Sequence, residues 1–175
     1  MEQKNNSSHA SHPALSFRMG HGYDIHQLIS GRPLILGGVH IPYEKGLDGH
    51  SDADCLLHAL SDAILGAMGL PDIGHYFPNN EMKYKGIHSM EILKKALSEA
   101  NKEGFEVNNV DLSLLAETPK IGPFIPQMRT LIAQALNIDP RAVGIKATTN
   151  EGQDSIGQGN SIAAHAVVLM RVRCE

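Results

Sequence analysis

Strand-like and helix-like segments alternate along the chain, and their order limits the possible folds more than any other feature of the sequence. Segments typical of strands occupy residues 17–28, 34–41, 107–116, 143–149 and 161–172. Segments with apolar residues at helical spacing occupy residues 52–69, 89–102 and 125–136. This order predicts an α/β (α+β) fold, in which a single two-layer domain contains a mixed β-sheet packed with helices.

Local signals predict the first turn and the ends of the first helix. Segment 34–41 is expected to pair with the first strand as a hairpin, across a turn at residues 30–33. Ser51 followed three residues later by Asp54 resembles an N-terminal capping arrangement. Gly69, with a proline two residues later, marks the helix end.

Length and composition narrow the classes of function. A chain of 175 residues suits one domain, which we place at residues 17–175, after a polar N-terminal extension at residues 1–16 that is expected to be disordered. A net charge of −4 and 5% aromatic residues leave no basic stripe or stacking surface for nucleic acid. No apolar stretch approaches the roughly 18 residues of a membrane span. Two cysteines are typical of a reduced, cytoplasmic protein.

Asp24, His26 and His58 form the strongest candidate site. Residues two apart on a strand project from the same face, so Asp24 and His26 can bind one ion together, and His58 comes from the helix that follows. One carboxylate and two imidazoles suit Zn²⁺, or another divalent transition metal, with a fourth position left for water or substrate. Chance spacing among the 10 histidines is the alternative. Cys55 is expected in the core, whereas Asp62 either orients His58 or is solvated.

Residues 49–52 form a candidate phosphate site. They precede the first expected helix, whose free N–H groups and dipole attract anions. His50 can add a hydrogen-bond donor or a positive charge. The alternative is ordinary helix capping by Ser51 beside an exposed His50.

Two later segments also contain groups that could act on phosphates. Residues 117–123 form a proline-bounded loop whose backbone could contact a small planar ring while Lys120 meets phosphate. Residues 146–151 end a strand, where Thr149 can donate to a phosphoryl oxygen and Glu151 suits Mg²⁺ held partly by substrate phosphates. Each segment alone is equally well an ordinary strand end. Together with a metal site they indicate phosphoryl chemistry.

Four motifs resemble those of the 2-C-methyl-D-erythritol 2,4-cyclodiphosphate synthase family, in its order and spacing. They are Gly-His-Gly-Tyr-Asp-Ile-His at residues 20–26, Gly-His-Ser-Asp-Ala-Asp at 49–54, Leu-Pro-Asp-Ile-Gly-His-Tyr-Phe-Pro at 70–78 and Lys-Ala-Thr-Thr-Asn-Glu at 146–151. The similarity runs from about residue 17 to residue 173. It implies a homotrimer with active sites at the subunit interfaces.

The reaction that the resemblance implies is an intramolecular phosphoryl transfer in the non-mevalonate pathway to isoprenoids. The 2-phosphate of 4-diphosphocytidyl-2-C-methyl-D-erythritol 2-phosphate attacks its own β-phosphorus. The attack closes a cyclic diphosphate and expels CMP. The implied partner is therefore a small molecule linked to cytidine diphosphate.

The resemblance also assigns site residues by position, in two groups. The group on one subunit consists of Asp24, His26 and His58 as Zn²⁺ ligands, His50 and Ser51 at the 2-phosphate, and Asp72 and Gly74 at the erythritol hydroxyls. The group from the neighbouring subunit consists of Ala116, Pro119, Lys120, Ile121 and Gly122 around the cytosine, Ala147, Thr148 and Thr149 at the diphosphate, and Glu151 as a ligand of Mg²⁺ or Mn²⁺. His50 and Thr149 are the residues expected to act in catalysis.

The chain departs from the family pattern in two places. The segment Asn79-Asn80-Glu81 stands where the best-known members have Asp-x-Asp. This difference affects the contacts that are expected to bind the erythritol part of the substrate. Ser155, Gln158 and Asn160 replace a Phe, an Arg and a Glu. Because the Arg and Glu are associated with a cavity on the trimer axis that holds isoprenoid diphosphates, we expect no such binding here.

Two other functions compete with the cyclase. A zinc hydrolase would need a general base near the open metal position and would consume water. A trimeric nucleotide- or metal-binding protein without catalysis would bind CDP and release no CMP.

Overall fold

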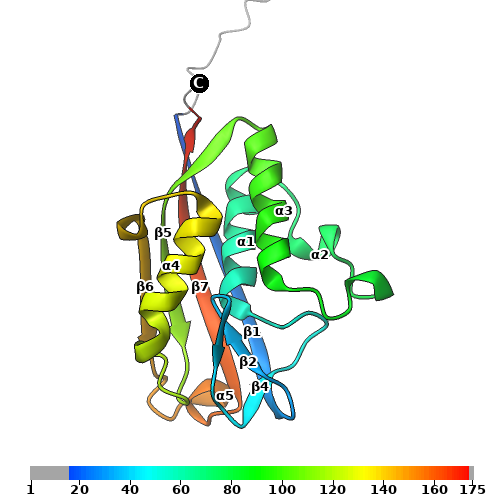
Figure 1. The fold of residues 1–175 in the computed structure, drawn as a ribbon, viewed down its shortest axis with the longest axis vertical. Coiled ribbons are helices and arrows are strands. Elements are labelled where there is room, and N and C mark those ends of the chain that lie inside the picture. Colours follow the sequence, from blue (N-terminus) through cyan, green and yellow to red (C-terminus); the bar gives the residue numbers. More distant parts are fainter. Residues whose placement is uncertain (1–15, 174–175) are drawn as a thin grey trace, which may run out of the picture.

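The computed structural model describes residues 16–173, in which one sheet of five strands has helices against one face (Figure 1). The strands are β1 (Phe17–Ser30), β2 (Leu34–Leu36), β3 (Val39–Ile41), β4 (Lys45–Leu47), β5 (Phe105–Leu115), β6 (Val143–Thr148) and β7 (Ser161–Val172). The α-helices are α1 (Cys55–Ala67), α2 (Ile73–Tyr76), α3 (Ser89–Lys102), α4 (Ile125–Leu136) and α5 (Asp154–Gly157), and 3₁₀ turns lie at Met82–Tyr84, Gly122–Phe124 and Pro140–Ala142. The expected fold class is confirmed. Residues 1–15 of the expected N-terminal extension, and the second of the two cysteines, Cys174, lie outside the described residues.

The sheet is mixed, in the order β4-β1-β7-β5-β6. β1 and β7 run antiparallel along most of their length, from the pair Phe17–Arg171 to the pair Gln27–Ser161. β5 runs antiparallel to β7 but parallel to β6, and α4 forms the crossover that a parallel pair needs. The carboxyl ends of β5 and β6 therefore lie side by side, where the Ala116 N–H donates to the Thr148 carbonyl over 2.9 Å.

Helix α1 lies at the centre of the domain, between β1 and β7 on one side and α3 on the other (Figure 1). Leu56, Leu57, Leu60 and Ile64 are almost completely buried. The side that carries the polar His58 is also buried, because α3 covers it. Cys55 is a free, fully buried thiol, as expected of a core residue.

The prediction of a hairpin between β1 and segment 34–41 is wrong. That segment folds on itself, so that β2 and β3 form a separate two-stranded sheet. The reason is the pair Gly37–Gly38 between them, both with positive φ (57° and 75°), the backbone that a tight hairpin turn requires. On the side of β1 that faces away from β7, the neighbouring strand is instead β4, where Leu47 pairs with Leu28.

The prediction that Ser51 caps the first helix is also wrong. The N-cap is Asp54, whose side chain accepts from the Leu57 N–H, and α1 begins at Cys55. Ser51 instead accepts from the Ala53 N–H in the preceding loop, over 2.9 Å. The Asp54 side chain accepts from one of the free N–H groups at the helix start, and the phosphate site expected at residues 49–52 stays a prediction.

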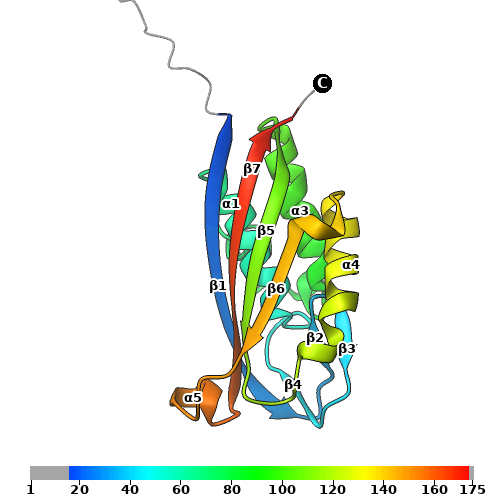
Figure 2. The same cartoon turned by 90° about the vertical axis from the view of Figure 1, so that its left-hand side faces the viewer.

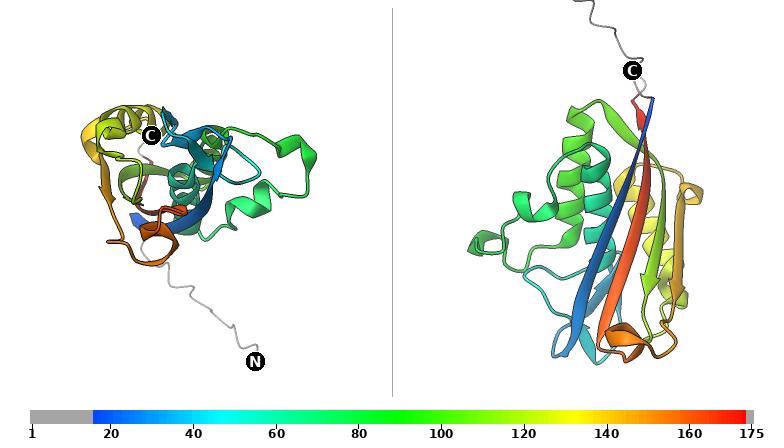
Figure 3. Two further views of the ribbon diagram at one scale, coloured as in Figure 1. Left: turned by 90° about the horizontal axis from the view of Figure 1, so that it is seen from below. Right: turned by 180° about the vertical axis from the view of Figure 1, so that it is seen from behind.

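In Figure 2 and in the rear view of Figure 3 the strands lie in front of α1 and α3, and only the short helix α5 lies on the second face of the sheet, at the lower end of the strands. Large apolar side chains of β1 and β7 project from this open face and remain exposed: Phe17, Met19, Tyr23, Ile25 and Val167. Monomeric proteins seldom expose a contiguous apolar patch of this kind, and such patches mark interaction sites.

Candidate functional site

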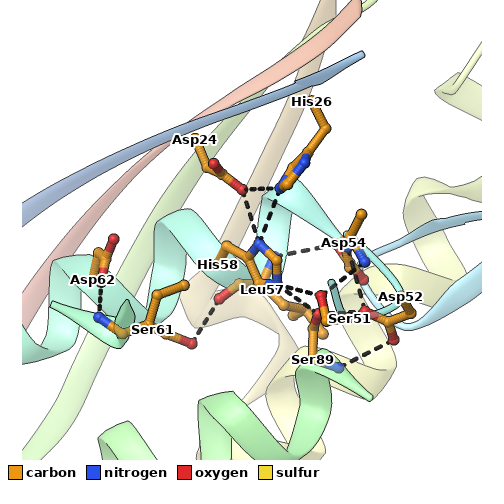
Figure 4. Close-up of polar contacts among 12 residues, drawn as sticks. Asp24, His26, Ser51, Asp52, Asp54, Leu57, His58, Ser61, Asp62 and Ser89 are labelled. Carbon is orange, nitrogen blue, oxygen red and sulfur yellow. Dashed lines mark hydrogen bonds and ion pairs between the residues drawn. The ribbon is translucent and has the colours of Figure 1, made fainter. Parts of the chain in front are cut away.

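The structure brings Asp24, His26 and His58 together on the helix-covered side of β1 (Figure 4). Alternation along β1 points Asp24 and His26 toward α1, from which His58 approaches. Gly20 and Gly22 lie on the same face of β1 and allow α1 very close, since a Cβ at Gly22 would stand only 1.9 Å from the Ala59 carbonyl oxygen. This close approach of helix and strand is what places the three side chains within reach of one ion.

Their ligand atoms match a metal site. Asp24 Oδ2 lies 2.9 Å from both His26 Nε2 and His58 Nδ1, and these two nitrogens lie 3.3 Å apart. Ligands about 2.0–2.1 Å from a tetrahedral zinc ion stand roughly 3.3–3.4 Å apart. The three side chains therefore need to open only slightly to hold a divalent metal, and the expected grouping of these residues is present.

The second nitrogen of each histidine ring is already hydrogen-bonded. His26 Nδ1 donates to the Asp48 carbonyl oxygen over 2.6 Å. His58 Nε2 lies 2.8 Å from Ser89 Oγ and 3.1 Å from Ser51 Oγ. Metal-binding histidines characteristically donate their other N–H in this way, which leaves one lone pair for the ion.

The electrostatics of this cluster favour an ionised carboxylate. Burial would raise the pKa of Asp24, but hydrogen bonds and charge from His26 and His58 outweigh it and hold the pKa well below its ordinary value. Burial alone would lower the pKa of His26, and its hydrogen bond to Asp24 instead raises it. Asp24 therefore remains an anionic ligand at neutral pH.

These ligands line a cavity of about 230 Å³, which we call the metal pocket. His50, Ser51 and Gly74, expected at the substrate, also line it. Sequence reasoning missed several apolar and aromatic wall residues: Ile73, Phe77, Tyr84, Ile87 and Ile92. Phe77 and Tyr84 meet edge to face, with ring centroids 5.1 Å apart, and no periodic pattern in this loop could have indicated that contact.

Asp62 neither orients His58 nor is simply solvated, so both readings of it are wrong. Its Oδ1 accepts from the Ile73 N–H over 2.8 Å. Asp72, expected at the substrate hydroxyls, is the N-cap of the short helix α2 and accepts from the His75 N–H. Asp62 thus fixes the start of α2, and with it Gly74, at the wall of the metal pocket.

The remaining expected residues lie around a second cavity, of about 390 Å³, which we call the loop pocket. Its lining includes Ala116, Pro119, Lys120, Ile121, Gly122, Ala147, Thr148 and Thr149. Glu151 lies outside the lining, although its Oε1 accepts from Thr149 Oγ1 over 2.7 Å. Glu151 is exposed and adopts a positive φ of 49°.

The two pockets share no lining residue. The metal pocket lies beside β1, whereas the loop pocket lies at the carboxyl ends of β5 and β6, with β7 between them in the sheet. One chain therefore does not bring the two groups of expected residues together.

A larger hollow, of about 600 Å³, lies between α3, α4 and the end of β7. Its lining has the carboxylate Glu106 but no histidine or cysteine. Size alone therefore does not identify the functional site of this chain, and the donor chemistry favours the metal pocket.

The fold and the metal pocket define a class, an α/β protein that could hold a divalent metal beside a substrate-sized cavity. The model of the YgbB family matches residues 17–171, and the chain belongs to this family. No helix within residues 16–173 is long and apolar enough to cross a membrane.

The relatives of the chain include named enzymes. A 2-C-methyl-D-erythritol 2,4-cyclodiphosphate synthase of Geobacter sulfurreducens is 54% identical over 153 residues, which cover 87% of this chain and 98% of that protein. The synthase of a Synechococcus strain is 52% identical over 156 residues, covering 89% and 99%. Among solved structures, IspF of Plasmodium falciparum in a CDP complex has a TM-score of 0.80 at 33% identity, covering 91% of this chain and 98% of that one.

Proposed function

We propose that this chain is a 2-C-methyl-D-erythritol 2,4-cyclodiphosphate synthase. It converts 4-diphosphocytidyl-2-C-methyl-D-erythritol 2-phosphate into 2-C-methyl-D-erythritol 2,4-cyclodiphosphate and CMP, in the non-mevalonate pathway to isoprenoid precursors. The observation that carries the proposal is the Asp24, His26 and His58 cluster, opening into a pocket lined by His50 and Ser51, in a chain that matches such synthases along almost their whole length.

Asp24, His26 and His58 would hold Zn²⁺, or another divalent transition metal, since their donor atoms and spacing suit it. When bound, such an ion polarises a phosphoryl oxygen and offsets charge. The protein's part is to hold both histidines in the tautomer that leaves one nitrogen free, and to keep Asp24 ionised. Burial of His58 and the hydrogen bond of His26 to Asp48 support this role.

His50 and Ser51 would bind the 2-phosphate at the mouth of the metal pocket. His50 Nε2 faces the Glu81 carbonyl oxygen at 3.4 Å, a long contact that leaves the ring able to turn to a substrate oxygen. Asp72 and Gly74 would contact the erythritol hydroxyls. Asn79 lines the same pocket, so the Asn-Asn-Glu segment contributes an amide there rather than a carboxylate.

The loop pocket would bind the cytidine diphosphate part of the substrate. Its predominantly apolar wall and backbone groups suit a small planar base, and Lys120 adds a positive charge. Thr149 would donate to the diphosphate, and Glu151 would ligate Mg²⁺ or Mn²⁺ together with phosphate oxygens. The present bond from Thr149 to Glu151 keeps both groups at one end of β6.

This division of roles fits the physical demands of the reaction. The attacking 2-phosphate is already an anion, so little base catalysis is needed. The barrier lies in bringing two anionic phosphates together in line, which positioning and preorganised positive charge lower. The two pockets supply these contributions from opposite ends of the substrate.

We further propose a homotrimer in which each active site joins the metal pocket of one subunit to the loop pocket of the next. Two observations support it: the pockets lie apart within one chain, and the open face of the sheet exposes a row of apolar side chains. Cyclic homo-oligomers commonly cover such surfaces by heterologous contacts. The free Cys55 thiol fits a reducing, cytoplasmic location.

The test is ³¹P NMR of the diphosphocytidyl methylerythritol phosphate substrate incubated with the protein, zinc and Mg²⁺. We expect the monophosphate resonance to disappear while CMP and a coupled pair of cyclic diphosphate signals grow. CMP with a linear phosphate product would instead identify a hydrolase. An unchanged spectrum from metal-loaded protein that binds CDP would identify a binding protein without catalysis.

A further inference from the structure

Behind the metal pocket, a serine and an aspartate lie in a hydrogen-bonded chain that ends on His58 (Figure 4). Ser89 is the first residue of α3 and is fully buried. Its Oγ lies 2.8 Å from His58 Nε2 and also bonds to Asp52 Oδ1. Neither Ser89 nor Asp52 lines the metal pocket, so they reach the ion site only through the imidazole.

The direction of these hydrogen bonds follows from counting protons. A serine hydroxyl has one proton, and an ionised carboxylate can only accept. The Ser89 hydroxyl must therefore donate to Asp52. Its oxygen is then available to His58 only as an acceptor, so His58 Nε2 must carry a proton. The proton on Nε2 leaves Nδ1 as the nitrogen for the ion, and without an ion Nδ1 shares a hydrogen bond with Asp24 Oδ2 over 2.9 Å.

Asp52 is well placed to keep this arrangement fixed. Its Oδ2 accepts from the Ser89 backbone N–H over 3.0 Å, so one carboxylate holds both polar groups of the serine. Its own backbone N–H donates to the Ile87 carbonyl oxygen over 3.1 Å, which ties the loop before α1 to the segment before α3. The carboxylate is mostly buried, with a side-chain exposure of 11%.

The neighbouring Ser51 does not duplicate the role of Ser89. Its Oγ lies 3.1 Å from His58 Nε2, but it also accepts from the Ala53 N–H and has no carboxylate that takes its proton. The Ser51 hydroxyl is therefore free to turn and could equally accept from or donate to the ring. Only Ser89, held by Asp52, specifies the tautomer of His58.

We propose that Asp52 and Ser89 are positioning residues that set the Nε2–H tautomer of His58 and so prepare Nδ1 to bind the metal. This inference deepens the proposed function and rests on its metal site. Removal of the partner of a metal-binding histidine typically lowers metal affinity by about 10- to 100-fold. The same loss is expected here.

The first test compares Ser89→Ala with Ser61→Ala. Ser61 is an equally buried serine on α1, whose hydroxyl donates to the Leu57 carbonyl oxygen over 2.7 Å. We expect Ser89→Ala to weaken Zn²⁺ binding at least tenfold in competition with a chelator, while Ser61→Ala binds as the parent does. Equal affinity in Ser89→Ala and the parent would overturn the proposal.

The second test observes the tautomer directly in metal-free protein. Two-bond ¹H–¹⁵N correlation spectra distinguish a protonated Nε2 from a protonated Nδ1. We expect a proton on His58 Nε2 in the parent and a partly unprotonated Nε2 in Ser89→Ala. A parent ring with no proton on Nε2 would overturn the proposal whether or not the protein proves to be a cyclase. A protonated Nε2 in a protein that binds no metal would count against the proposed function alone.

Asp52→Asn tests the contribution of the carboxylate while the Ser89 hydroxyl is kept. It also replaces Ser89→Ala as the test if that variant does not fold. An amide oxygen can still accept from Ser89, but the amide can also present its N–H₂ and reverse the chain. We expect zinc affinity between those of the parent and Ser89→Ala, and Ser89→Thr, which keeps the hydroxyl, should bind zinc within about threefold of the parent. Two results would contradict the proposed role of Ser89 and Asp52. One is a zinc affinity of Asp52→Asn equal to that of the parent, and the other is a zinc affinity of Ser89→Thr as weak as that of a variant without a metal ligand.

Discussion

Asp54 is a fully buried carboxylate whose three hydrogen bonds join two parts of the fold. It accepts from the N–H groups of Gly37 and Gly38 over 2.9 and 2.7 Å and from the Leu57 N–H over 3.2 Å. Burial, the largest effect, raises the pKa of Asp54 from 3.8 to about 6, although these bonds oppose it. The β2–β3 turn is thus attached to the helix that carries His58 by a group that titrates at mildly acid pH.

This raised pKa predicts how stability depends on pH. Because the pKa of Asp54 is higher in the folded state, the folded protein binds more protons than the unfolded chain between pH 3.8 and about 6, and stability falls as pH rises through this window. The free energy of unfolding of the parent, relative to Asp54→Asn, should fall by about 2 kcal/mol from pH 4 to pH 7. Urea unfolding of metal-free protein measures it, and a constant difference over this range would refute the assignment.

Glu151 permits a second prediction at the scale of single residues. Glu151→Gln keeps an oxygen that can accept from Thr149 but removes the charge proposed to bind Mg²⁺. We expect kcat for CMP release to fall by about 100-fold. Bound zinc, measured by elemental analysis, should stay at the parent level because Glu151 lies outside the metal pocket. Unchanged turnover would eliminate the role of Glu151 as a metal ligand.

The decisive contact between elements is that of β1 with α1. A Cβ at Gly20 would lie 1.8 Å from the Ala63 carbonyl oxygen, just as one at Gly22 would meet Ala59. Both obstacles are helix backbone, which cannot turn aside as a flexible side chain would. The distance from Asp24 and His26 to His58 therefore depends on two positions that have no side chain.

Gly22→Ala should move α1 away from β1 and separate the metal ligands. Overpacking of this kind costs about 1–3 kcal/mol, and zinc affinity should fall with stability. Gly66→Ala is the control, because Gly66 lies in the same helix with no atom within 4 Å of its Cβ position. That change should stabilise the protein by roughly 0.5–1 kcal/mol and leave zinc binding unchanged. Parent-like zinc affinity in Gly22→Ala would show that the close approach is not what builds the site.

At the scale of the whole molecule, much of the fold follows from periodicity. The expected ranges for α3, α4 and β7 coincide with the observed elements, because long amphipathic or alternating segments pack as their patterns indicate. The expected single strand over residues 34–41 is wrong because the adjacent glycines Gly37 and Gly38 favour a tight turn, which divides the segment into β2 and β3. The three-residue strand β4 and the helix α2 were not predicted, since their stability comes from tertiary contacts such as the bond between Asp62 and Ile73.

The metal ligands of the candidate site can be predicted from the sequence, whereas the residues that hydrogen-bond to them cannot. The spacing of Asp24 and His26 on a strand indicates one shared face, so the grouping with His58 needed only the helix to pack nearby. The roles of Ser89 and Asp52 were not foreseen. Ser89 lies 31 residues after His58 and begins another helix, so that no local pattern connects them.

We propose above that one reaction needs two pockets, which two copies of the chain supply. His26→Ala should disable the metal pocket and Thr149→Ala the loop pocket, so that each variant alone releases little CMP. In trimers formed by co-refolding equal amounts of both variants, random assembly gives roughly a quarter of the interfaces two intact pockets.

The measurement is the rate of CMP release by these mixed trimers. We expect recovery to roughly a quarter of the parent rate per site, well above the rate of either variant alone. Mixed trimers as inactive as the separate variants would contradict it, because the two pockets would then have to act within a single chain.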